Sequence, residues 1–300
     1  MSLVVLAVGG NALMQRGKDF GTGAQQQNLE RACDVIASIA REHTLVLTHG
    51  NGPQVGILAL RAEEARGNWR ESLDVLGAET DGMIGYLLAR ELGTRLPDRQ
   101  IASLLTQVEV DADDPAFAAP TKPIGSVYSE EEAARLAAEQ GWRVARDGDG
   151  WRRVVSSPDP KRIVELDSIR LLIEAGHLVV AAGGGGVPVT IDHHGTLRGA
   201  EAVVDKDLTA ALLASGVGAD TLLLLTDASA IYRDWPNRDD PIRRISPDEV
   251  RSLPLPAGSM GPKAEAAARF AEASGGRALI GAIEDAEALM AGETGTEVAV

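Results

Sequence analysis

The sequence predicts an α/β fold built around a mainly parallel β-sheet. Short apolar runs without charged residues recur along the chain, as strands buried on both faces of a sheet do. Segments with helical periodicity lie between these runs, and glycine-rich turns follow several of them. Such alternation of strands and helices is typical of a sheet covered by helices.

Six of the apolar runs are rich in Leu and β-branched residues, and we predict that they form strands. They are residues 3–8, 44–48, 101–106, 178–182, 221–225 and 278–281. Two of the intervening segments show a clear helical pattern. Residues 28–41 place Leu29 and Ile36 on one apolar face, and residues 262–274 place Phe270 on another.

Residues 111–156 depart from this alternation. They contain the proline-bearing TKPIG, the charged helical stretch SEEEAARLAAEQ and then RDGDGWRRVV, which is typical of a hairpin. We predict a small polar subdomain inserted into the first half of a single domain that spans residues 1–300. The regular pattern starts again near residue 157.

The chain carries an excess of acidic residues. Its formal net charge is −15, from 29 Lys and Arg against 44 Asp and Glu. This balance argues against binding nucleic acid or an anionic membrane through a broad basic face. A small anion needs only a few local cations, so the charge does not exclude one.

Two further features of the sequence bear on where in the cell the protein is located. Cys33 is the only cysteine, so no intrachain disulfide is possible, and its helical surroundings predict a small buried thiol. The longest nearly uncharged stretch, HLVVAAGGGGVPVTI, is broken by four glycines and a proline, so no membrane span is expected. Since the start of the chain lacks a signal-peptide core, we expect a cytoplasmic protein.

Three glycine-rich turns follow predicted strands: GGNAL (9–13), HGNGPQVG (49–56) and GGGGVPV (183–189). In sheets of this class, ligands bind beyond the carboxyl ends of the strands. Such turns present backbone N–H groups to an anion, although glycine also ends strands for structural reasons alone. None of them fits a P-loop, but together they predict an anion site at the edge of the sheet.

Three lysines lie in conspicuous motifs: Lys122 in TKPIG, Lys206 in DKD and Lys263 in GSMGPK. A lysine is a compact point charge that can follow a phosphoryl group as it moves, and phosphoryl transfer depends mainly on such charges. Any one of them taken alone is better explained as an exposed surface residue without a role. Either Asp205 or Asp207 is a suitable N-cap for the helix that begins near Lys206.

Other polar residues leave two readings open. Asp227 follows the predicted strand 221–225 and either caps a turn or faces the ribose of a nucleotide. His49 either polarises a ligand oxygen or holds its own glycine turn. His193 and His194 are adjacent in a predicted hairpin and lack the spacing of a zinc pair, so no protein metal site is expected.

The ordered set of motifs resembles the carbamate kinases of the amino acid kinase superfamily. The motifs that carry this resemblance are AVGGNAL, LTHGNGPQVG, LDVLGAETDGMIGY, PTKPIG, GWRRVVSSPDPKRIVE, GGGGVPV, AVVDKDLTAALLA, LTDASAIY and GSMGPKAEAAARF. The resemblance implies a three-layer αβα sandwich over an open sheet of about eight strands, usually assembled as a homodimer. It identifies residues 111–156 with the lid subdomain of the family.

The activity that the resemblance implies is reversible phosphoryl transfer, ATP + carbamate ⇌ ADP + carbamoyl phosphate. ATP or ADP is then a substrate, and Mg²⁺ binds through the nucleotide phosphates. Residues 1–200 correspond to the half that binds the small substrate, and residues 201–300 to the half that binds the nucleotide. In this family the reaction commonly serves arginine breakdown.

The resemblance also assigns roles to individual residues. Residues expected to contact the small substrate or its phosphate are Gly9, Gly10, Asn11, Gly50, Asn51, Gly52, Gly184 and Gly185. Catalytic residues are expected to be Lys122, Lys206, Asp207 and Lys263, with Asp207 holding the site lysines in place. Nucleotide contacts are expected from Asp227, Tyr232, Met260 and Gly261.

Two positions depart from the wider superfamily. Many members have a lysine where this chain has Val8, which makes Lys206 the natural replacement cation, and Ser229 stands where relatives often have Asp. Alternative functions are a kinase acting on another small carboxylate or phosphonate, and a non-catalytic sensor of carbamoyl phosphate or nucleotide. A dinucleotide oxidoreductase is disfavoured because the Rossmann fingerprint is missing.

Overall fold

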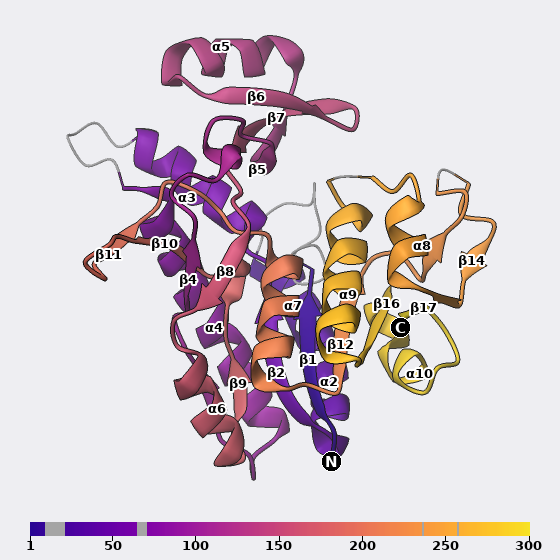
Figure 1. Cartoon of the computed structure of the whole chain (residues 1–300). Coiled ribbons are helices and arrows are strands. Elements are labelled where there is room, and N and C mark those ends of the chain that lie inside the picture. Colours follow the sequence, from indigo (N-terminus) through magenta and orange to yellow (C-terminus); the bar gives the residue numbers. More distant parts are fainter. Residues whose placement is uncertain (10–21, 65–70, 236, 257) are drawn as a thin grey trace.

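An eight-stranded sheet runs through the middle of the protein in the computed structural model (Figure 1). The structure describes residues 1–9, 22–64, 71–235, 237–256 and 258–300. In spatial order the strands are β15 (Arg244–Ile245), β17 (Thr296–Val298), β16 (Arg277–Ala282), β12 (Thr221–Thr226), β1 (Leu3–Val8), β2 (Thr44–His49), β9 (Leu178–Val180) and β3 (Ile101–Ser103). Neighbouring strands are parallel except β16 and β17. This confirms the predicted mainly parallel sheet.

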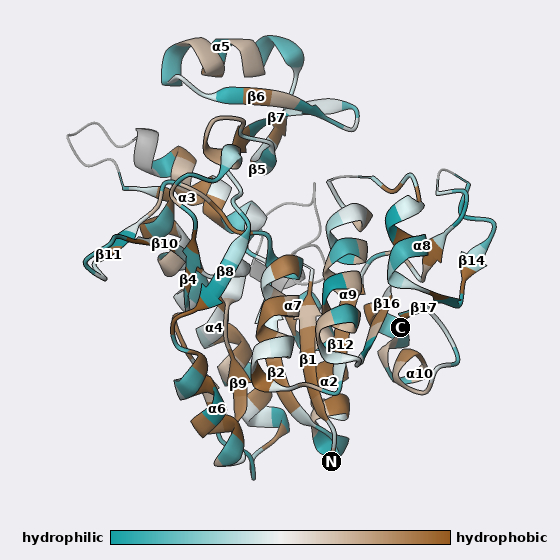
Figure 2. Ribbon diagram, in the orientation of Figure 1, coloured by the Kyte–Doolittle hydropathy of each residue, from teal (hydrophilic) through white to brown (hydrophobic). Residues whose placement is uncertain are grey.

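The central strands supply side chains to two separate cores because successive residues point to opposite faces. In β1, Val5 and Ala7 belong to one core, and Val4, Leu6 and Val8 belong to the other. Helices cover both faces: α6 (Leu166–Glu174), α7 (Lys206–Val217), α8 (Pro247–Ser252) and α9 (Met260–Ser274) contribute to the first core, and α2 (Thr22–Glu42), α4 (Leu73–Arg95) and α10 (Ala286–Met290) to the second. Figure 2 shows the apolar strands between polar helix surfaces. The predicted three-layer αβα sandwich is confirmed.

Two predicted strands end earlier than the sequence pattern suggested. The run 101–106 is a strand only to Ser103, and the run 178–182 only to Val180. The side-chain oxygen of Thr106 accepts the N–H group of Ala182 at 2.9 Å. Ala182 has a φ of 54°, in the left-handed region, so the backbone has already turned toward the glycines.

Smaller sheets flank the main one. A four-stranded sheet is formed by β11 (Leu197–Gly199), β10 (Val187–Ile191), β4 (Gln107–Val110) and β8 (Pro160–Ile163). A two-stranded ribbon is formed by β13 (Ile231–Tyr232) and β14 (Pro241–Ile242). Three short 3₁₀ helices are η1 (Pro115–Phe117), η2 (Gly183–Gly185) and η3 (Ile283–Asp285). The sequence analysis predicted the β10–β11 hairpin but not the sheet to which it belongs.

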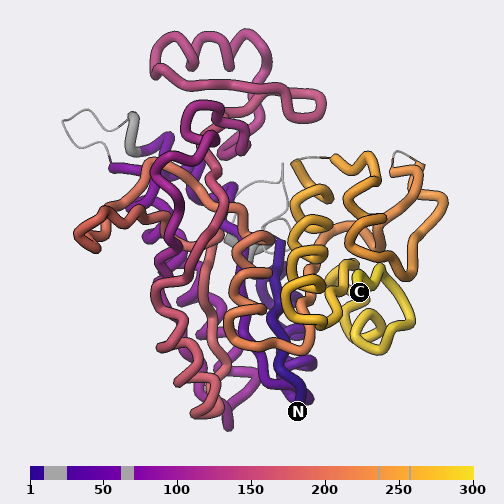
Figure 3. The backbone as a smooth tube through the Cα atoms, in the orientation of Figure 1, coloured from indigo at the N-terminus to yellow at the C-terminus, as the bar shows by residue number. Residues whose placement is uncertain are grey.

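The segment predicted to be a lid subdomain, residues 111–156, contains a three-stranded sheet, ordered β5 (Lys122–Tyr128), β7 (Gly150–Val155) and β6 (Arg143–Asp147), with α5 (Glu130–Gln140) over it. Figure 3 shows this magenta segment set apart from the main body. It rests on α3 (Gly52–Glu64), where the backbones come close together. A Cβ added to Gly56 would lie 1.9 Å from Gly125 Cα, so the contact requires a residue without a side chain.

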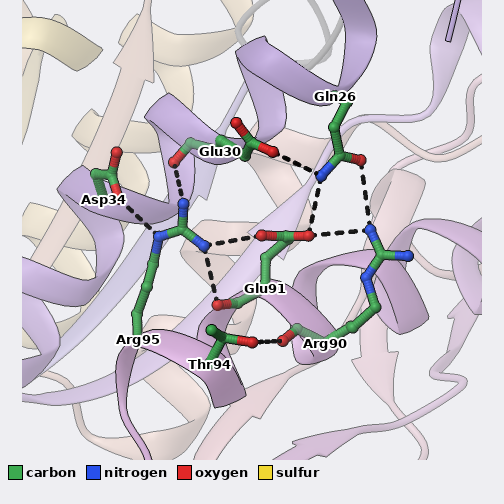
Figure 4. Close-up of polar contacts among 7 residues, drawn as sticks. All are labelled: Gln26, Glu30, Asp34, Arg90, Glu91, Thr94 and Arg95. Atoms are coloured by element: carbon green, nitrogen blue, oxygen red, sulfur yellow. Dashed lines mark hydrogen bonds and ion pairs between the residues drawn. The ribbon is translucent and has the colours of Figure 1, made fainter. Parts of the chain in front are cut away.

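The helices α2 and α4 are joined at their polar edge by a network around Glu91 (Figure 4). The Glu91 carboxylate accepts hydrogen bonds from Arg95 Nη1 at 2.8 Å, Gln26 Nε2 at 3.0 Å and Arg90 Nη2 at 2.9 Å. Arg95 also donates through Nε to Asp34 Oδ1 at 2.7 Å. The network thus fixes the register of the two helices above their shared apolar core.

The remaining predictions about the chain's general character concern Cys33 and the membrane. Cys33 lies on α2 and is fully buried, as predicted, and burial raises the pKa of its thiol to about 12. No helix in the described part of the chain is long and apolar enough to cross a membrane.

Candidate active site

A cavity of about 420 Å³ lies at the carboxyl ends of β1, β2 and β12. Its lining comes from eight places in the chain, represented by Gly9, Gly50–Gly52, Lys122, the pair Asp147 and Arg152, Gly184, Asp205–Asp207, Asp227 and Lys263. Parallel strands bring their carboxyl ends to one edge of a sheet, so turns far apart in sequence meet there. The structure therefore brings together ten of the residues singled out from the sequence: Gly9, Gly50, Asn51, Gly52, Lys122, Gly184, Lys206, Asp207, Asp227 and Lys263.

The glycine turns differ in what they offer a ligand. The N–H groups of Gly9 and Gly50 are occupied by the carbonyls of Leu225, at 3.2 Å, and Val8, at 3.0 Å. Both bonds continue the strand pairing past the ends of β1 and β2. Gly52 instead opens α3, where helix geometry provides no carbonyl for its N–H group. The donor most clearly directed to an anion is therefore that of Gly52, at the positive end of a helix.

Gly184 lies against the turn after β2 and has a φ of 69°. A Cβ at this position would lie 2.2 Å from Asn51 Nδ2, so any side chain would displace the Asn51 amide. The Asn51 amide is held from the other side by α4, where Nδ2 donates to Thr80 Oγ1 at 2.8 Å. The turn at Gly184 and the turn at Asn51 are thus packed into one wall of the cavity.

Two residues behind this wall carry no signal in the sequence that predicts a role in the site. Thr80 and Asp81 are buried, at 0% and 2% exposure, although they lie in the middle of a helix among polar neighbours. Asp81 Oδ1 is 3.4 Å from His49 Nε2, which supports the reading of His49 as a residue that holds its own turn. The only available signal was the TD pair within LDVLGAETDGMIGY. Such a pair normally indicates an exposed helical face.

Asp207 binds two lysines from different elements. Lys206 Nζ lies 2.7 Å from Asp207 Oδ1, and Lys263 Nζ lies 2.9 Å from Asp207 Oδ2. Asp207 is in the first turn of α7 and Lys263 in the first turn of α9, so the positive ends of two helices meet here. Each ammonium keeps further donors for an anion in the cavity.

Burial shapes the ionisation of this cluster. Desolvation opposes the charge of Asp207, but its two lysines outweigh that effect and hold the pKa of the carboxyl well below its usual value. Desolvation, aided by repulsion from Lys263, lowers the pKa of Lys206. Desolvation acts on Lys263 as well, but the Asp207 carboxylate outweighs it and raises the Lys263 pKa. The cluster thus places two ammonium groups on one carboxylate, with burial opposing the charge of Lys206 in particular.

Asp205 is the N-cap of α7. Its Oδ1 accepts the N–H groups of Asp207 at 2.9 Å and Leu208 at 3.3 Å. This decides between the two candidate N-caps in favour of Asp205. Its other oxygen, Oδ2, forms an ion pair with Lys122 Nζ at the base of the lid subdomain.

Other residues predicted for the site lie outside the lining of this cavity. Met260 and Gly261 form the start of α9 behind Lys263, and Gly185 lies behind Gly184 with its N–H group bonded to Ala182 O at 3.0 Å. Tyr232 is buried, and its hydroxyl is 2.6 Å from Ser229 Oγ. Gly10 and Asn11 fall outside the described residues.

A second cavity, of about 430 Å³, lies between the lid subdomain and the start of α4. Its polar lining includes Glu71, Arg143, Arg153 and Glu201. None of the three site lysines and none of the strand-end glycines contributes to it. The first cavity is therefore the candidate active site.

Comparison with known proteins agrees with this geometry. The model of the amino acid kinase family matches residues 2–282. The carbamate kinase of Haemophilus influenzae is 49% identical over 298 residues, which cover 98% of this chain and 96% of that protein. The carbamate kinase of Escherichia coli strain K12 is 46% identical over 301 residues, with 99% of both chains covered.

Solved structures show the same similarity. A carbamate kinase from Giardia lamblia bound to citric acid has a TM-score of 0.93 and 36% identity, with 99% of this chain and 98% of that chain covered. The same enzyme bound to AMP-PNP has a TM-score of 0.86 at 36% identity, with the same shares covered. A UMP kinase from Bacillus anthracis, at 13% identity and a TM-score of 0.57, shares the fold alone. With full-length similarity in both sequence and structure, this chain belongs to the carbamate kinases of the amino acid kinase family.

Proposed function

We propose that this protein catalyses reversible phosphoryl transfer between ATP and carbamate, in the cavity at the ends of β1, β2 and β12. The observation that carries this proposal is the pair of buried lysines, Lys206 and Lys263, held on the two oxygens of Asp207. A phosphoryl group in transit carries negative charge on its equatorial oxygens and is stabilised by cations that are already in position. A protein that only binds its ligand does not need cations organised for a moving charge.

The two sides of the cavity suggest where the substrates bind. The turns at Gly9, Gly50–Gly52 and Gly184 belong to residues 1–200, which we assign to carbamate and carbamoyl phosphate. We extend this assignment to Gly10, Asn11 and Gly185, their neighbours in the sequence. Lys122 contributes from the lid subdomain. Residues 201–300 supply Asp227 at the rim, with Tyr232, Met260 and Gly261 behind the lining, and we assign this side to ATP or ADP.

In the forward direction the carbamate oxygen attacks the terminal phosphorus of ATP, and ADP leaves with the electrons of the broken P–O bond. Lys206 and Lys263 stabilise the charge on the transferring group, and Asp207 keeps the two ammonium groups from moving apart. The Gly52 N–H group and the start of α3 hold the small anion. No covalent enzyme intermediate is required, because in-line positioning and charge stabilisation suffice.

Mg²⁺ is proposed to enter with the nucleotide. In the described part of the chain, no group of three or more His, Cys, Asp or Glu side chains gathers as a metal site. Of the carboxylates that line the cavity, Asp205 and Asp207 are bound to lysines and Asp147 to Arg152, whereas Asp227 is exposed and accepts a hydrogen bond from Thr226 Oγ1 at 3.1 Å. This arrangement fits a metal ion that is held mainly by the nucleotide phosphates, with Asp227 nearby. It does not fit a metal ion that is held by protein carboxylates alone.

The relatives support the wider setting of the proposal. They are named carbamate kinases, and one solved structure is of such an enzyme bound to AMP-PNP. We further propose a cytoplasmic homodimer that contributes to arginine metabolism, as the family resemblance implies.

The decisive assay is ATP formation from ADP and carbamoyl phosphate, with acetyl phosphate as the competing phosphoryl donor. A carbamate kinase forms ATP from carbamoyl phosphate and much less from acetyl phosphate. Equal rates with both donors, or a preference for another carboxylate or phosphonate, would reassign the acceptor within the same fold. Ligand binding without turnover in either direction would instead indicate a sensor.

Lys206→Ala tests the mechanism. Loss of one preorganised charge of this kind lowers kcat by about 10²- to 10³-fold. Lys161→Ala is the matched control, because Lys161 is exposed and its ion pair with Asp159 lies outside the cavity. The measurement is the steady-state rate of ATP formation, with circular dichroism to confirm that both variants are folded. A near-normal rate for Lys206→Ala would contradict the assigned role.

A further inference from the structure

The Asp205 carboxylate joins two parts of the molecule that are far apart in sequence. One oxygen caps α7 through the N–H groups of Asp207 and Leu208, and the other binds Lys122 Nζ. Asp205 is only 6% exposed, so its carboxylate is largely removed from water, whereas the Lys122 side chain is partly exposed. We propose that Asp205 is a positioning residue of the reaction, which holds the ammonium of Lys122 in the cavity. This inference rests on the phosphoryl-transfer function proposed above.

The base of the lid subdomain is where Lys122 and Asp205 meet. Lys122 is the first residue of β5 and pairs with Val155, the last residue of β7, so both lid strands begin or end here. Directly beyond β7, Ser156 O accepts the N–H group of Val203 at 3.0 Å. The segment that leads into α7 is thus attached to the lid base by a backbone bond and by the ion pair between side chains.

A held lysine differs from a free one in conformational entropy. The Lys122 side chain is 32% exposed, and a long flexible side chain loses rotamer freedom when it is fixed. Asp205 fixes it before the substrate arrives, so less of that freedom is lost in the transition state. An ammonium has three donors, so Lys122 can keep Asp205 on one of them and present the others to a phosphoryl oxygen.

The first turn of α7 then organises all three site lysines. Asp207 holds Lys206 and Lys263, and Asp205 holds Lys122, so each cation has a carboxylate partner on one rigid element. Asp205 therefore does more than cap the helix. Its removal is expected to affect catalysis through Lys122, with little effect on the fold when the capping oxygen is kept.

Asp205→Asn separates these two contributions. Asn caps helices about as well as Asp, so α7 is retained, whereas the neutral amide cannot pair with the ammonium. We expect kcat/KM for carbamoyl phosphate to fall about tenfold in the otherwise native enzyme, because residues in direct contact commonly show interaction energies of that order. Asp205→Ser, also a good cap, serves as the second variant if Asp205→Asn does not fold. Asp192→Asn is the matched control, since Asp192 accepts the N–H groups of His194 and Thr196 away from the cavity.

The double mutant identifies the route of the effect. If Asp205 acts through Lys122, Asp205→Asn lowers kcat/KM by a much smaller factor in a Lys122→Ala background than in the native one. Asp205 also lies near Lys206 and Lys263, and any effect through them remains in that background. The same fold loss in both backgrounds, or no loss in the native one, overturns the proposal.

A second readout does not depend on turnover. Hydrogen exchange of the lid backbone is measured in the full-length protein without ligands. We expect faster exchange of β5 and β7 in Asp205→Asn and in Lys122→Ala than in the native protein, with no change in Asp192→Asn. Unchanged lid exchange in Asp205→Asn would refute the contact's role at the lid base. If the native protein forms no ATP, the proposed function fails while this measurement still reports on Asp205.

Discussion

At the scale of single residues, the Asn51 amide reaches the cavity in an orientation set by Thr80. Thr80 Oγ1 accepts from Asn51 Nδ2 at 2.8 Å and lies within hydrogen-bonding distance of carbonyl groups one turn earlier in α4. Both residues are buried, so water does not replace the bond when it is lost. The position of Asn51 therefore depends on a residue that does not line the cavity.

Thr80→Val keeps the shape of the side chain and removes this acceptor. One buried neutral hydrogen bond is worth about 1 kcal/mol, so we expect KM for carbamoyl phosphate to rise about fivefold with KM for ADP unchanged. Thr80→Ser retains the hydroxyl and should restore the native value. Initial-rate kinetics with each substrate varied in turn make the comparison, and equal KM values for the Val and Ser variants would count against this role.

Site residues that lie in a recognisable turn motif were predictable from the sequence. Lys206 and Lys263 follow glycine- or aspartate-rich turns, and the structure brings both to Asp207. Thr80 and the pairing of Lys122 with Asp205 were not predictable in this way. Thr80 lies within a helix whose polar residues look exposed, and Lys122 and Asp205 are separated by 83 positions. Such contacts are fixed by tertiary packing, which local pattern does not encode.

At the scale of elements, the buried parallel strands were predictable because each is an uninterrupted apolar run. The four-stranded sheet containing β4 and β8 was not, because these strands are four residues long and carry polar side chains, as in QVEV and PKRI. Short strands of this kind are formed by their neighbours in the sheet rather than by their own propensity. Helix periodicity similarly placed α2 and α9 in the chain, but it did not predict the contact between α2 and α4.

The contact between α2 and α4 makes a prediction about pH. Hydrogen bonds from Arg95 and then Gln26 outweigh desolvation and hold the pKa of Glu91 below its usual 4.5. A carboxyl whose pKa is depressed by folding stabilises the protein above its unfolded pKa, and this stability is lost as pH falls through the folded value. Glu91→Gln should therefore destabilise the protein at neutral pH, with a difference from the native protein that shrinks below about pH 4.5.

Thermal unfolding across that pH range provides the measurement. For a chain of this size, a loss of about 1 kcal/mol lowers the melting temperature by about 2 °C at neutral pH. Glu79→Gln is the control, because Glu79 is an exposed carboxylate on the same helix. A pH-independent difference between native protein and Glu91→Gln would show that packing, rather than charge, is what the substitution removes.

At the scale of the whole molecule, the outer face of α4 exposes apolar side chains that a monomer leaves in water. Met83 is 44% exposed and Tyr86 62% exposed, on the same helix, and Leu105 is 57% exposed. A Cβ at Gly82 of α4 would lie 3.9 Å from Leu105 Cδ2, so Leu105 adjoins this face. Exposed apolar surface of this kind is typical of protein interfaces, and we infer that this face supplies the contact of the proposed homodimer.

Substitution of Met83 and Tyr86 by Lys tests this assembly. Two charges in an apolar interface should weaken the dimer by about 30-fold or more, as loss of central interface residues does. Sedimentation velocity of the native protein and of the double variant across a range of concentrations gives the dissociation constants. Leu171→Lys is the matched control, because Leu171 is 66% exposed but lies on α6, across the main sheet from α4. A native protein that sediments as a monomer, or equal dissociation of the double variant and the control, would place any partner elsewhere.

Activity retained in a monomeric variant would further show that the cavity is complete within one chain.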